Sequence, residues 1–272
     1  MTRIRIITAY DGTDFSGFQK LPGKRTVEGE LSRAISELCG EEIGIIGASR
    51  TDSGVHALGN VTVFDTSSSI PPERMALAIN TRLPRDLRVL ASESCEADWH
   101  PRKHASIKTY EYRIYNGRIE DPLGRRYRSF CPYSLDVEAM DSALKALVGT
   151  HDFTSFANPA SQVLQRGGDA IRTIHEAGIS RLSEGGFGGG AGELCIRISG
   201  SGFLYNMVRI IAGTVMEVGT GARRPEDMEQ ILMDRDRRSA GMTAEARGLF
   251  LRSIVYTEER QSPADHPKEK DI

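Results

Sequence analysis

A single acidic residue, Asp52, lies in the polar run of residues 49–57, where a carboxylate could act as a nucleophile. The run follows an apolar stretch, residues 43–48, that is typical of a β-strand, and loops at strand ends often carry catalytic side chains. Free aspartate has a pKa of about 3.9, so Asp52 is expected to be ionised near neutral pH and able to attack an electrophile. The alternative is a purely structural β-turn, because Asp, Ser and Gly are all common turn residues.

A second charged residue, Arg209, stands in an otherwise apolar run, residues 203–218, that predicts a buried helix. A lone charge in apolar surroundings costs free energy unless an ionised partner lies nearby. We therefore expect Arg209 to pair with an acidic side chain, unless its long stem carries the guanidinium to the surface.

The hydrophobic pattern of the first half predicts the elements that must position Asp52. Alternating apolar residues indicate strands, and apolar residues at helical spacing indicate helices. The predicted strands cover residues 3–10, 43–50, 59–66 and 86–97, and the predicted helices run from Thr26 to about Cys39 and from Pro71 to about Arg82. The order is β-α-β-β-α-β, and Asp52 lies in the turn between the two central strands.

The second half repeats this order of elements without repeating the sequence. Its predicted strands cover residues 107–115, 171–182, 193–199 and 248–256, and its predicted helices run from Asp136 to about Val148, over residues 203–218 and from Pro225. Each half matches the split β-α-β pattern of ferredoxin-like folds. We predict an α+β fold of two related ferredoxin-like βαββαβ subdomains whose sheets are joined. The helices are expected on one side of the sheet, which leaves the other side free to line a cleft, and the catalytic cleft is expected between the subdomains.

The predicted domain boundaries follow from this repeat. Residues 1–103 form an N-terminal catalytic subdomain with Asp52, residues 104–257 a C-terminal subdomain with Tyr110 and Arg209, and residues 258–272 a polar tail expected to be disordered. The Gly-rich residues 185–192 join two predicted strands. A hairpin connection is therefore expected there, because a dinucleotide-binding loop must follow a strand and open a helix.

Composition and cysteine spacing exclude several classes of protein. Of the 272 residues, 39% are hydrophobic and 26% are charged, as in soluble globular proteins. Charges interrupt the longest apolar stretch and the first residues lack an apolar signal-peptide core, so we expect a cytoplasmic protein without membrane contact. The four cysteines are far apart and form no Cys-x-x-Cys pair, so neither a zinc site nor a disulfide framework is expected. No motif indicates a metal or a cofactor.

The charge is unevenly distributed along the chain. The formal net charge is −2, and residues 258–272 alone carry five acids and three bases, which leaves a neutral body. Residues 100–128 hold eight Lys or Arg against three acids. Local fields rather than totals attract phosphates, so this stretch is a candidate for contact with nucleic acid, although an ordinary solvated face would have the same composition.

Six segments closely resemble the motifs of tRNA pseudouridine synthases of the A type. They are Tyr10-Asp11-Gly12-Thr13 with Gly17-Phe18-Gln19, residues 49–57, residues 78–84, residues 151–156, residues 202–209 and residues 247–251. Each is short, but in this order they are highly specific and together extend almost to Tyr256.

The resemblance implies an activity and roles for Asp52, Arg209 and Tyr110. It implies a homodimeric isomerase that converts uridine to pseudouridine at positions 38, 39 and/or 40 of the tRNA anticodon stem-loop, with no cofactor and with Asp52 as nucleophile. It implies that Arg209 pairs with Asp52 and keeps it deprotonated, and that Tyr110 is the substrate-binding aromatic beside the target base. On spacing alone, Tyr110 could equally be a strand packing residue. Arg50 could hold a phosphate or prop the flipped nucleotide open, and His56 could bind substrate or, as we favour, stabilise the turn.

Several alternatives stay open at this point. Asp52 could attack the sugar C1′, attack the base C6, or remove a sugar proton. A non-catalytic RNA-binding protein of duplicated RRM-like fold is a rival, but the candidate strands at residues 60–64 and 193–197 lack the aromatic-rich RRM pattern. A glycoside hydrolase would need two facing carboxylates, and no second acid accompanies Asp52 in its motif.

Overall fold

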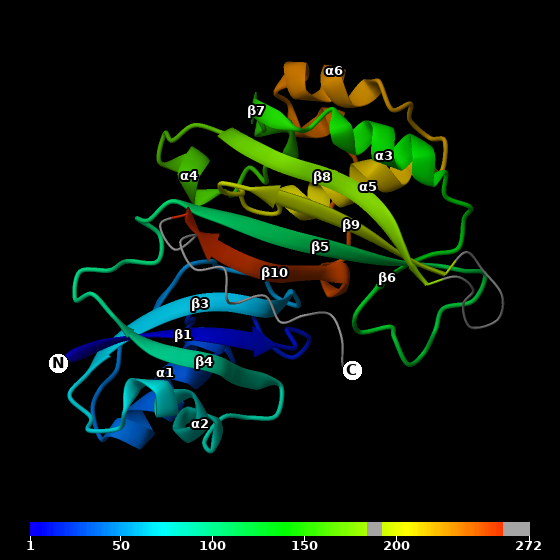
Figure 1. Ribbon diagram of the computed structural model, residues 1–272. Helices are drawn as coiled ribbons and strands as arrows, with labels where there is room; N and C mark the ends of the chain where they lie inside the picture. Colours follow the sequence, from blue (N-terminus) through cyan, green and yellow to red (C-terminus); the bar gives the residue numbers. More distant parts are fainter. Residues whose placement is uncertain (184–191, 258–272) are drawn as a thin grey trace.

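The computed structural model describes residues 1–183 and 192–257 and shows a mixed α+β fold around one large sheet (Figure 1). The sheet has ten strands, and its main path runs β4-β1-β3-β10-β5-β9-β8-β7, with β2 paired to β3 and β6 paired to β5. All pairings are antiparallel except β3–β10 and β5–β6. The α+β class predicted from the sequence is confirmed.

The strands have the following bounds: β1 Thr2–Tyr10, β2 Ile46–Gly47, β3 His56–Thr66, β4 Leu87–Cys95, β5 Ser106–Asn116, β6 Ser129–Cys131, β7 Gly149–Asp152, β8 Ile171–Ser183, β9 Gly192–Gly200 and β10 Leu249–Tyr256. The α-helices are α1 Val27–Cys39, α2 Met75–Asn80, α3 Val137–Lys145, α4 Gln162–Gln165, α5 Met207–Gly219 and α6 Asp227–Asp234. Four 3₁₀ turns complete the described elements: η1 Pro72–Arg74, η2 Thr154–Phe156, η3 Arg237–Ser239 and η4 Ala246–Gly248.

The two halves of the chain meet along a short parallel seam. In the first half the strands lie in the order β4-β1-β3-β2, and in the second half in the order β10-β5-β9-β8. The seam between β3 and β10 has only two residue pairs, His56 with Phe250 and Ala57 with Leu251. The first strand residues after the Asp52 turn are therefore held by the last strand of the chain.

Helix starts follow from local capping as the sequence predicted. The Thr26 side chain accepts a hydrogen bond from Gly29 N at the start of α1, and the Asp136 side chain accepts one from Ala139 N at the start of α3. Both helices bury one apolar face, and α1 ends at Gly40 in the left-handed region with φ 70°. The predicted helix at 203–218 begins later, at Met207, because Asn206 takes a left-handed conformation with φ 61° that an α-helix cannot include.

The strand predicted over residues 43–50 is wrong except for Ile46–Gly47. The Ile43 backbone bonds instead to side chains of α1: its N–H donates to Ser36 Oγ at 3.0 Å and its carbonyl accepts from Ser32 Oγ at 2.5 Å. At Gly47 the Phe18 ring lies 2.4 Å from where a Cβ would stand, so only glycine fits. Residues 43–50 therefore pack as an irregular segment that leads into the Asp52 turn.

The face of the sheet that carries Tyr110 is the helix-covered face. Tyr110, Tyr112 and Ile114 lie two residues apart along β5 and therefore share one face of the sheet. Tyr112 and Ile114 are fully buried in the apolar core that also contains α5. Glu111 lies on the opposite face, where its partner Arg197 is exposed. The prediction that the helix-free side of the sheet lines the cleft is therefore wrong. The candidate site lies on the helix-covered side, where α5 reaches the seam.

Several short elements were not predicted, namely β6, β7, α4 and the 3₁₀ turns η2, η3 and η4, because they lie in polar or irregular segments without periodicity. The turn η1 lies within the helix predicted from Pro71 to about Arg82. None of the helices within the described ranges is long and apolar enough to cross a bilayer. The predicted tail, 258–272, and most of the Gly-rich connection between β8 and β9 lie outside the described residues.

Candidate active site

Asp52 opens a tight turn directly before β3. The N–H of Val55 donates to the Asp52 carbonyl at 3.1 Å, and Gly54 has φ 79°, a conformation that favours glycine. The turn therefore fixes the backbone of Asp52 relative to the first residues of the strand.

The loop after β1 holds this turn from one side. A Cβ at Gly12 would lie 2.0 Å from the Val55 carbonyl oxygen, and a Cβ at Gly17 would lie 3.0 Å from the Thr51 carbonyl oxygen. The Ser53 hydroxyl donates to the Phe15 carbonyl at 3.2 Å. The glycines of the first motif are thus explained by two backbones packed against each other.

A buried polar network supports the turn from below. The Tyr10 hydroxyl bonds Thr51 Oγ1 at 2.7 Å, and the Asn60 amide donates to Tyr10 Oη at 3.2 Å and to the Ser49 carbonyl at 3.0 Å. All four side chains are buried. A buried polar group that loses its hydrogen-bond partner costs free energy, so this network makes the Asp52 loop rigid.

The structure brings Arg209 of α5 to Asp52, with Arg209 Nη1 3.6 Å from Asp52 Oδ2. Arg209 Nε donates to the Ala244 carbonyl at 2.8 Å and Nη1 donates to Asn206 Oδ1 at 3.3 Å, which fixes the guanidinium. The side chains are 16% exposed for Asp52 and 18% for Arg209, so they are mostly buried yet accessible to solvent. A carboxylate and a cation from opposite halves of the chain thus meet at a site that is partly shielded from solvent.

Burial dominates the electrostatics of Asp52. Loss of hydration raises the pKa of Asp52 above its ordinary value, and the nearby positive charge of Arg209 only partly offsets this. The expectation that Arg209 favours the ionised form is right in sign, but burial outweighs it. A poorly hydrated carboxylate is a stronger nucleophile than one in water once it is ionised.

Tyr110 lies beside this pair, with its hydroxyl 2.9 Å from Ser49 Oγ. Burial is the main cause that raises the pKa of Tyr110 to about 12, and the Asp52 charge adds to it, so the phenol stays neutral. The edge of the Tyr110 ring meets Phe203 with centroids 5.0 Å apart. Phe203 is a site residue that the sequence analysis missed as such, although it lies in the 202–209 motif.

Lys108 is a second residue whose position the sequence did not indicate. It lies two residues before Tyr110 on the same face of β5, and its Nζ donates to the Ala48 carbonyl at 2.9 Å. Burial, with a smaller contribution from Arg102, lowers the pKa of Lys108 to about 8. Lys108 therefore anchors the start of the Asp52 loop to β5. The only sequence signal for Lys108 was its spacing of two residues from Tyr110, which places both side chains on the same face of a strand.

Arg50 is exposed, two residues before Asp52. Within residues 1–183 and 192–257 it forms no ion pair, so its guanidinium is available to a ligand. Its predicted role as a phosphate contact or a prop for a flipped nucleotide stays a prediction.

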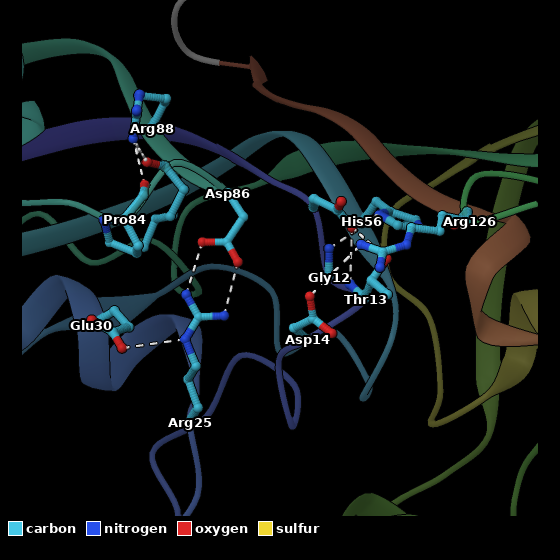
Figure 2. Close-up of polar contacts among 12 residues, drawn as sticks. Gly12, Thr13, Asp14, Arg25, Glu30, His56, Pro84, Asp86, Arg88 and Arg126 are labelled. Atoms are coloured by element: carbon cyan, nitrogen blue, oxygen red, sulfur yellow. Dashed lines mark hydrogen bonds and ion pairs between the residues drawn. The ribbon is translucent and has the colours of Figure 1, made fainter. Parts of the chain in front are cut away.

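His56 does not join the Asp52–Tyr110 group. It lies opposite Phe250 in the seam, on the helix-free face, and its ring stacks on Phe250 with centroids 4.6 Å apart. Gly12 N–H donates to Nδ1 at 3.1 Å, Asp11 Oδ1 lies 3.2 Å from Nδ1, and Nε2 lies 3.0 Å from the Arg126 carbonyl (Figure 2). The bond from Gly12 places the proton of the neutral ring on Nε2. Both ring nitrogens have partners within the protein, as expected of a residue that stabilises the turn, and the alternative role of His56 in substrate binding stays a prediction.

Protonation of His56 is expected to destabilise the fold. Burial lowers the pKa of His56, although the carboxylate of Asp11 and carbonyl partners oppose the shift. The stabilising contribution of the neutral ring is therefore present above the ordinary histidine pKa of about 6.5 and is lost as the pH falls through the lower folded-state value. Urea unfolding between pH 8 and pH 5 should show wild-type stability falling relative to His56→Asn, with a difference in slope of at most about 1.4 kcal/mol per pH unit, the value for one proton.

The Asn variant is a matched control because its amide oxygen can still accept the Gly12 N–H but does not titrate. Parallel stability curves for the two proteins across this range would contradict the assignment of a neutral, buried ring.

The remaining polar clusters do not suggest a metal centre. Within the described residues no group of three or more His, Cys, Asp or Glu side chains could hold a metal ion. The four cysteines, Cys39, Cys95, Cys131 and Cys195, are free thiols. Asp152, also in a motif, accepts hydrogen bonds from Thr154 N and Oγ1 and so forms an Asx turn directly before η2.

Comparison with known proteins decides between the candidate functions. A family model described as tRNA pseudouridine synthase matches residues 6–102 and 143–257. The chain belongs to the tRNA pseudouridine synthase family. It is accordingly an isomerase that converts uridine to pseudouridine in tRNA, and the rival predictions of a non-catalytic RNA-binding protein and of a hydrolase are set aside.

Curated relatives agree over nearly the whole chain. The chain is 41% identical over 256 residues to tRNA pseudouridine synthase A of Brevibacillus brevis, which covers 94% of this chain and 100% of the relative. It is 43% identical over 258 residues to the protein of that name from Geobacillus kaustophilus, covering 94% and 95% of the two chains. The protein of that name from Bacillus licheniformis is 43% identical over 256 residues, covering 93% and 99%.

Proposed function

We propose that this pseudouridine synthase modifies uridines at positions 38, 39 and/or 40 of the tRNA anticodon stem-loop, with Asp52 as the nucleophile. The observation that supports the role of Asp52 is its partly buried carboxylate, 3.6 Å from the fixed guanidinium of Arg209 and on the same side of the sheet as Tyr110. The positions in tRNA rest on the resemblance of the six sequence motifs.

The chemistry needs few groups. The C1′–N1 bond of uridine breaks, the uracil turns, and a C1′–C5 bond forms; C5 loses a hydrogen and N1 gains one, so substrate and product have the same atoms. Asp52 supplies an electron pair to the sugar C1′ or the base C6, or takes a sugar proton, and returns to its starting state. Tyr110 holds the detached base, and exposed Arg50 holds a flanking phosphate or keeps the nucleotide flipped.

The fold proposed from the sequence serves this chemistry. Residues 1–103 and 104–257 are two related ferredoxin-like subdomains, and their order of strands around β3 and β10 supports this interpretation. The substrate enters the cleft between them, where Asp52 and Arg209 meet. A homodimer, which would let one tRNA touch both subunits, and a cytoplasmic location remain part of the proposal.

Mapping of pseudouridine in tRNA is the direct test. Unmodified tRNA treated with the pure enzyme should gain pseudouridine at positions 38, 39 and/or 40 and nowhere else. Light scattering of the enzyme without tRNA should give twice the chain mass of 29.9 kDa. Modification confined to another arm of the tRNA would overturn the proposed target.

A further inference from the structure

The segment of residues 117–128, which joins β5 to β6, separates its charges in space. Its two acids are paired: Glu120 lies 2.9 Å from Arg247, and Asp121 is paired with Arg128, which also lies 3.1 Å from Glu193. The acids of the segment are therefore neutralised by arginines at its base.

The other three arginines of the segment point to solvent. Arg118, Arg125 and Arg126 are all exposed. Within the described part of the chain, neither Arg118 nor Arg125 has a carboxylate partner, and Arg126 has only Asp14, 3.8 Å away and itself 65% exposed. An ordinary solvated face mixes charges of both signs, whereas this one presents three cations to water.

Two exposed apolar side chains belong to the same segment as these cations. Leu123, in the middle of the segment, is 89% exposed, and Ile119 is 59% exposed. Exposed apolar groups beside arginines are a combination that suits nucleic acid, because arginines bind phosphates while an apolar side chain rests on sugars or base faces.

The segment is fastened to the back of the Asp52 turn. Tyr127 Oη donates to Asp11 Oδ2 at 2.8 Å, and the Arg126 carbonyl lies 3.0 Å from His56 Nε2. Arg247 Nη1 donates to the Arg125 carbonyl at 3.0 Å. Figure 1 shows the segment at the end of the sheet where β3 and β10 begin, and Figure 2 shows Arg126 beside Asp14 and His56.

This connection continues to the catalytic turn. Ala246, next to Arg247, has its Cβ 3.2 Å from the position that a Gly54 Cβ would take, and Gly54 is two residues from Asp52. The backbone of the segment that carries the exposed arginines is thus connected to the Asp52 turn through Arg247 and Ala246.

We propose that residues 117–128 form an RNA-contact surface at the rim of the active site, in which Arg118, Arg125 and Arg126 bind backbone phosphates of the tRNA and Leu123 rests on a sugar or base. The proposal rests on the proposed function and adds a contact to it. Because the body of the chain is nearly neutral, a local cluster of this kind must supply much of the attraction for RNA.

The test is a salt series of tRNA binding with matched variants. Arg118→Ala/Arg125→Ala/Arg126→Ala is compared with Arg74→Ala/Arg224→Ala/Arg238→Ala, which removes the same charge from exposed arginines elsewhere. Loss of three phosphate contacts should lower the slope of log Kd against log salt by about 2 and raise Kd at least about tenfold near 0.1 M salt. The control triple should stay within about twofold of the wild-type Kd, with its single-turnover rate at saturating enzyme unchanged.

Leu123→Ser separates the apolar contact from the charges. It should weaken tRNA binding about threefold or more without changing the salt slope, because an apolar contact releases no counterions. If the triple variant fails to fold, the double variant Arg118→Ala/Arg125→Ala replaces it, because it leaves the Arg126–Asp14 contact in place. The double variant should still lower the slope of log Kd against log salt by more than 1.

Three outcomes would overturn the inference: an unchanged salt slope and Kd in the folded segment variants, an equal loss in the control triple, or a changed oligomeric mass with normal tRNA binding, which would make the segment a subunit interface. Failure of the proposed function is distinguishable, because wild-type enzyme would then form no pseudouridine in the anticodon stem-loop whatever the segment does.

Discussion

Asp52→Asn is expected to abolish pseudouridine formation, lowering kcat/KM by at least about 10⁴-fold. The amide has nearly the shape of the carboxylate but cannot supply the electron pair. Tritium release from [5-³H]uridine tRNA measures the step, because C5 must lose its hydrogen when the new bond forms. Binding of tRNA should be nearly unchanged.

The stability of this variant is the control. Because burial raises the pKa of Asp52, the side chain favours the protonated form in the folded state, and this contribution is lost as the pH rises above its ordinary pKa. At neutral pH the ionised carboxylate therefore opposes folding, and the Asn variant should unfold at an equal or higher urea concentration. Turnover comparable to wild type in a folded Asn variant would refute the nucleophile assignment.

Arg209→Ala is expected to lower kcat/KM by roughly 10²–10³-fold and to move the acidic limb of the pH–rate profile to higher pH. Arg209 is the cation that lowers the pKa of Asp52 against the effect of burial, so its removal raises that pKa further. Tritium release measured from pH 5 to pH 9 would show both effects.

Arg209→Lys is the matched control for charge. It keeps the positive charge but loses the planar group that reaches both Ala244 and Asn206. Its acidic limb should stay near that of wild type while its maximal rate is intermediate. An unmoved limb in the Ala variant would show that Arg209 does not set the protonation of Asp52.

The elements that sequence reasoning placed well are the long periodic ones. The α1 helix was predicted from its apolar spacing and its Thr26 cap, and β1, β4, β5 and β10 from alternation, since these signals are local. Residues 43–50 look like a strand by composition. Their backbone bonds went to α1 instead, and no local signal reports a partner that is distant in sequence.

The site shows the same division. Spacing places His56 four residues after Asp52 and invites a shared role. The parallel register with Phe250, however, turns the ring to the opposite face of the sheet. In contrast, Lys108 and Phe203 gave no chemical signal in the sequence, yet they contact the Asp52 loop and the Tyr110 ring.

By itself the sequence determined the family, the nucleophile candidate and most of the regular elements, because motifs and periodicity are properties of neighbouring residues. The family resemblance implied the Asp52–Arg209 pair, but only the tertiary structure gave its geometry and decided which other side chains meet. The Asp52–Arg209 contact, the helix-side position of Tyr110 and the outward arginines of residues 117–128 all depend on strand register and on the β3–β10 seam. Register and seam are fixed by packing between segments that are far apart in the chain, 157 residues for Asp52 with Arg209 and 194 for His56 with Phe250. Spacing and composition report only on neighbouring residues and do not encode these contacts.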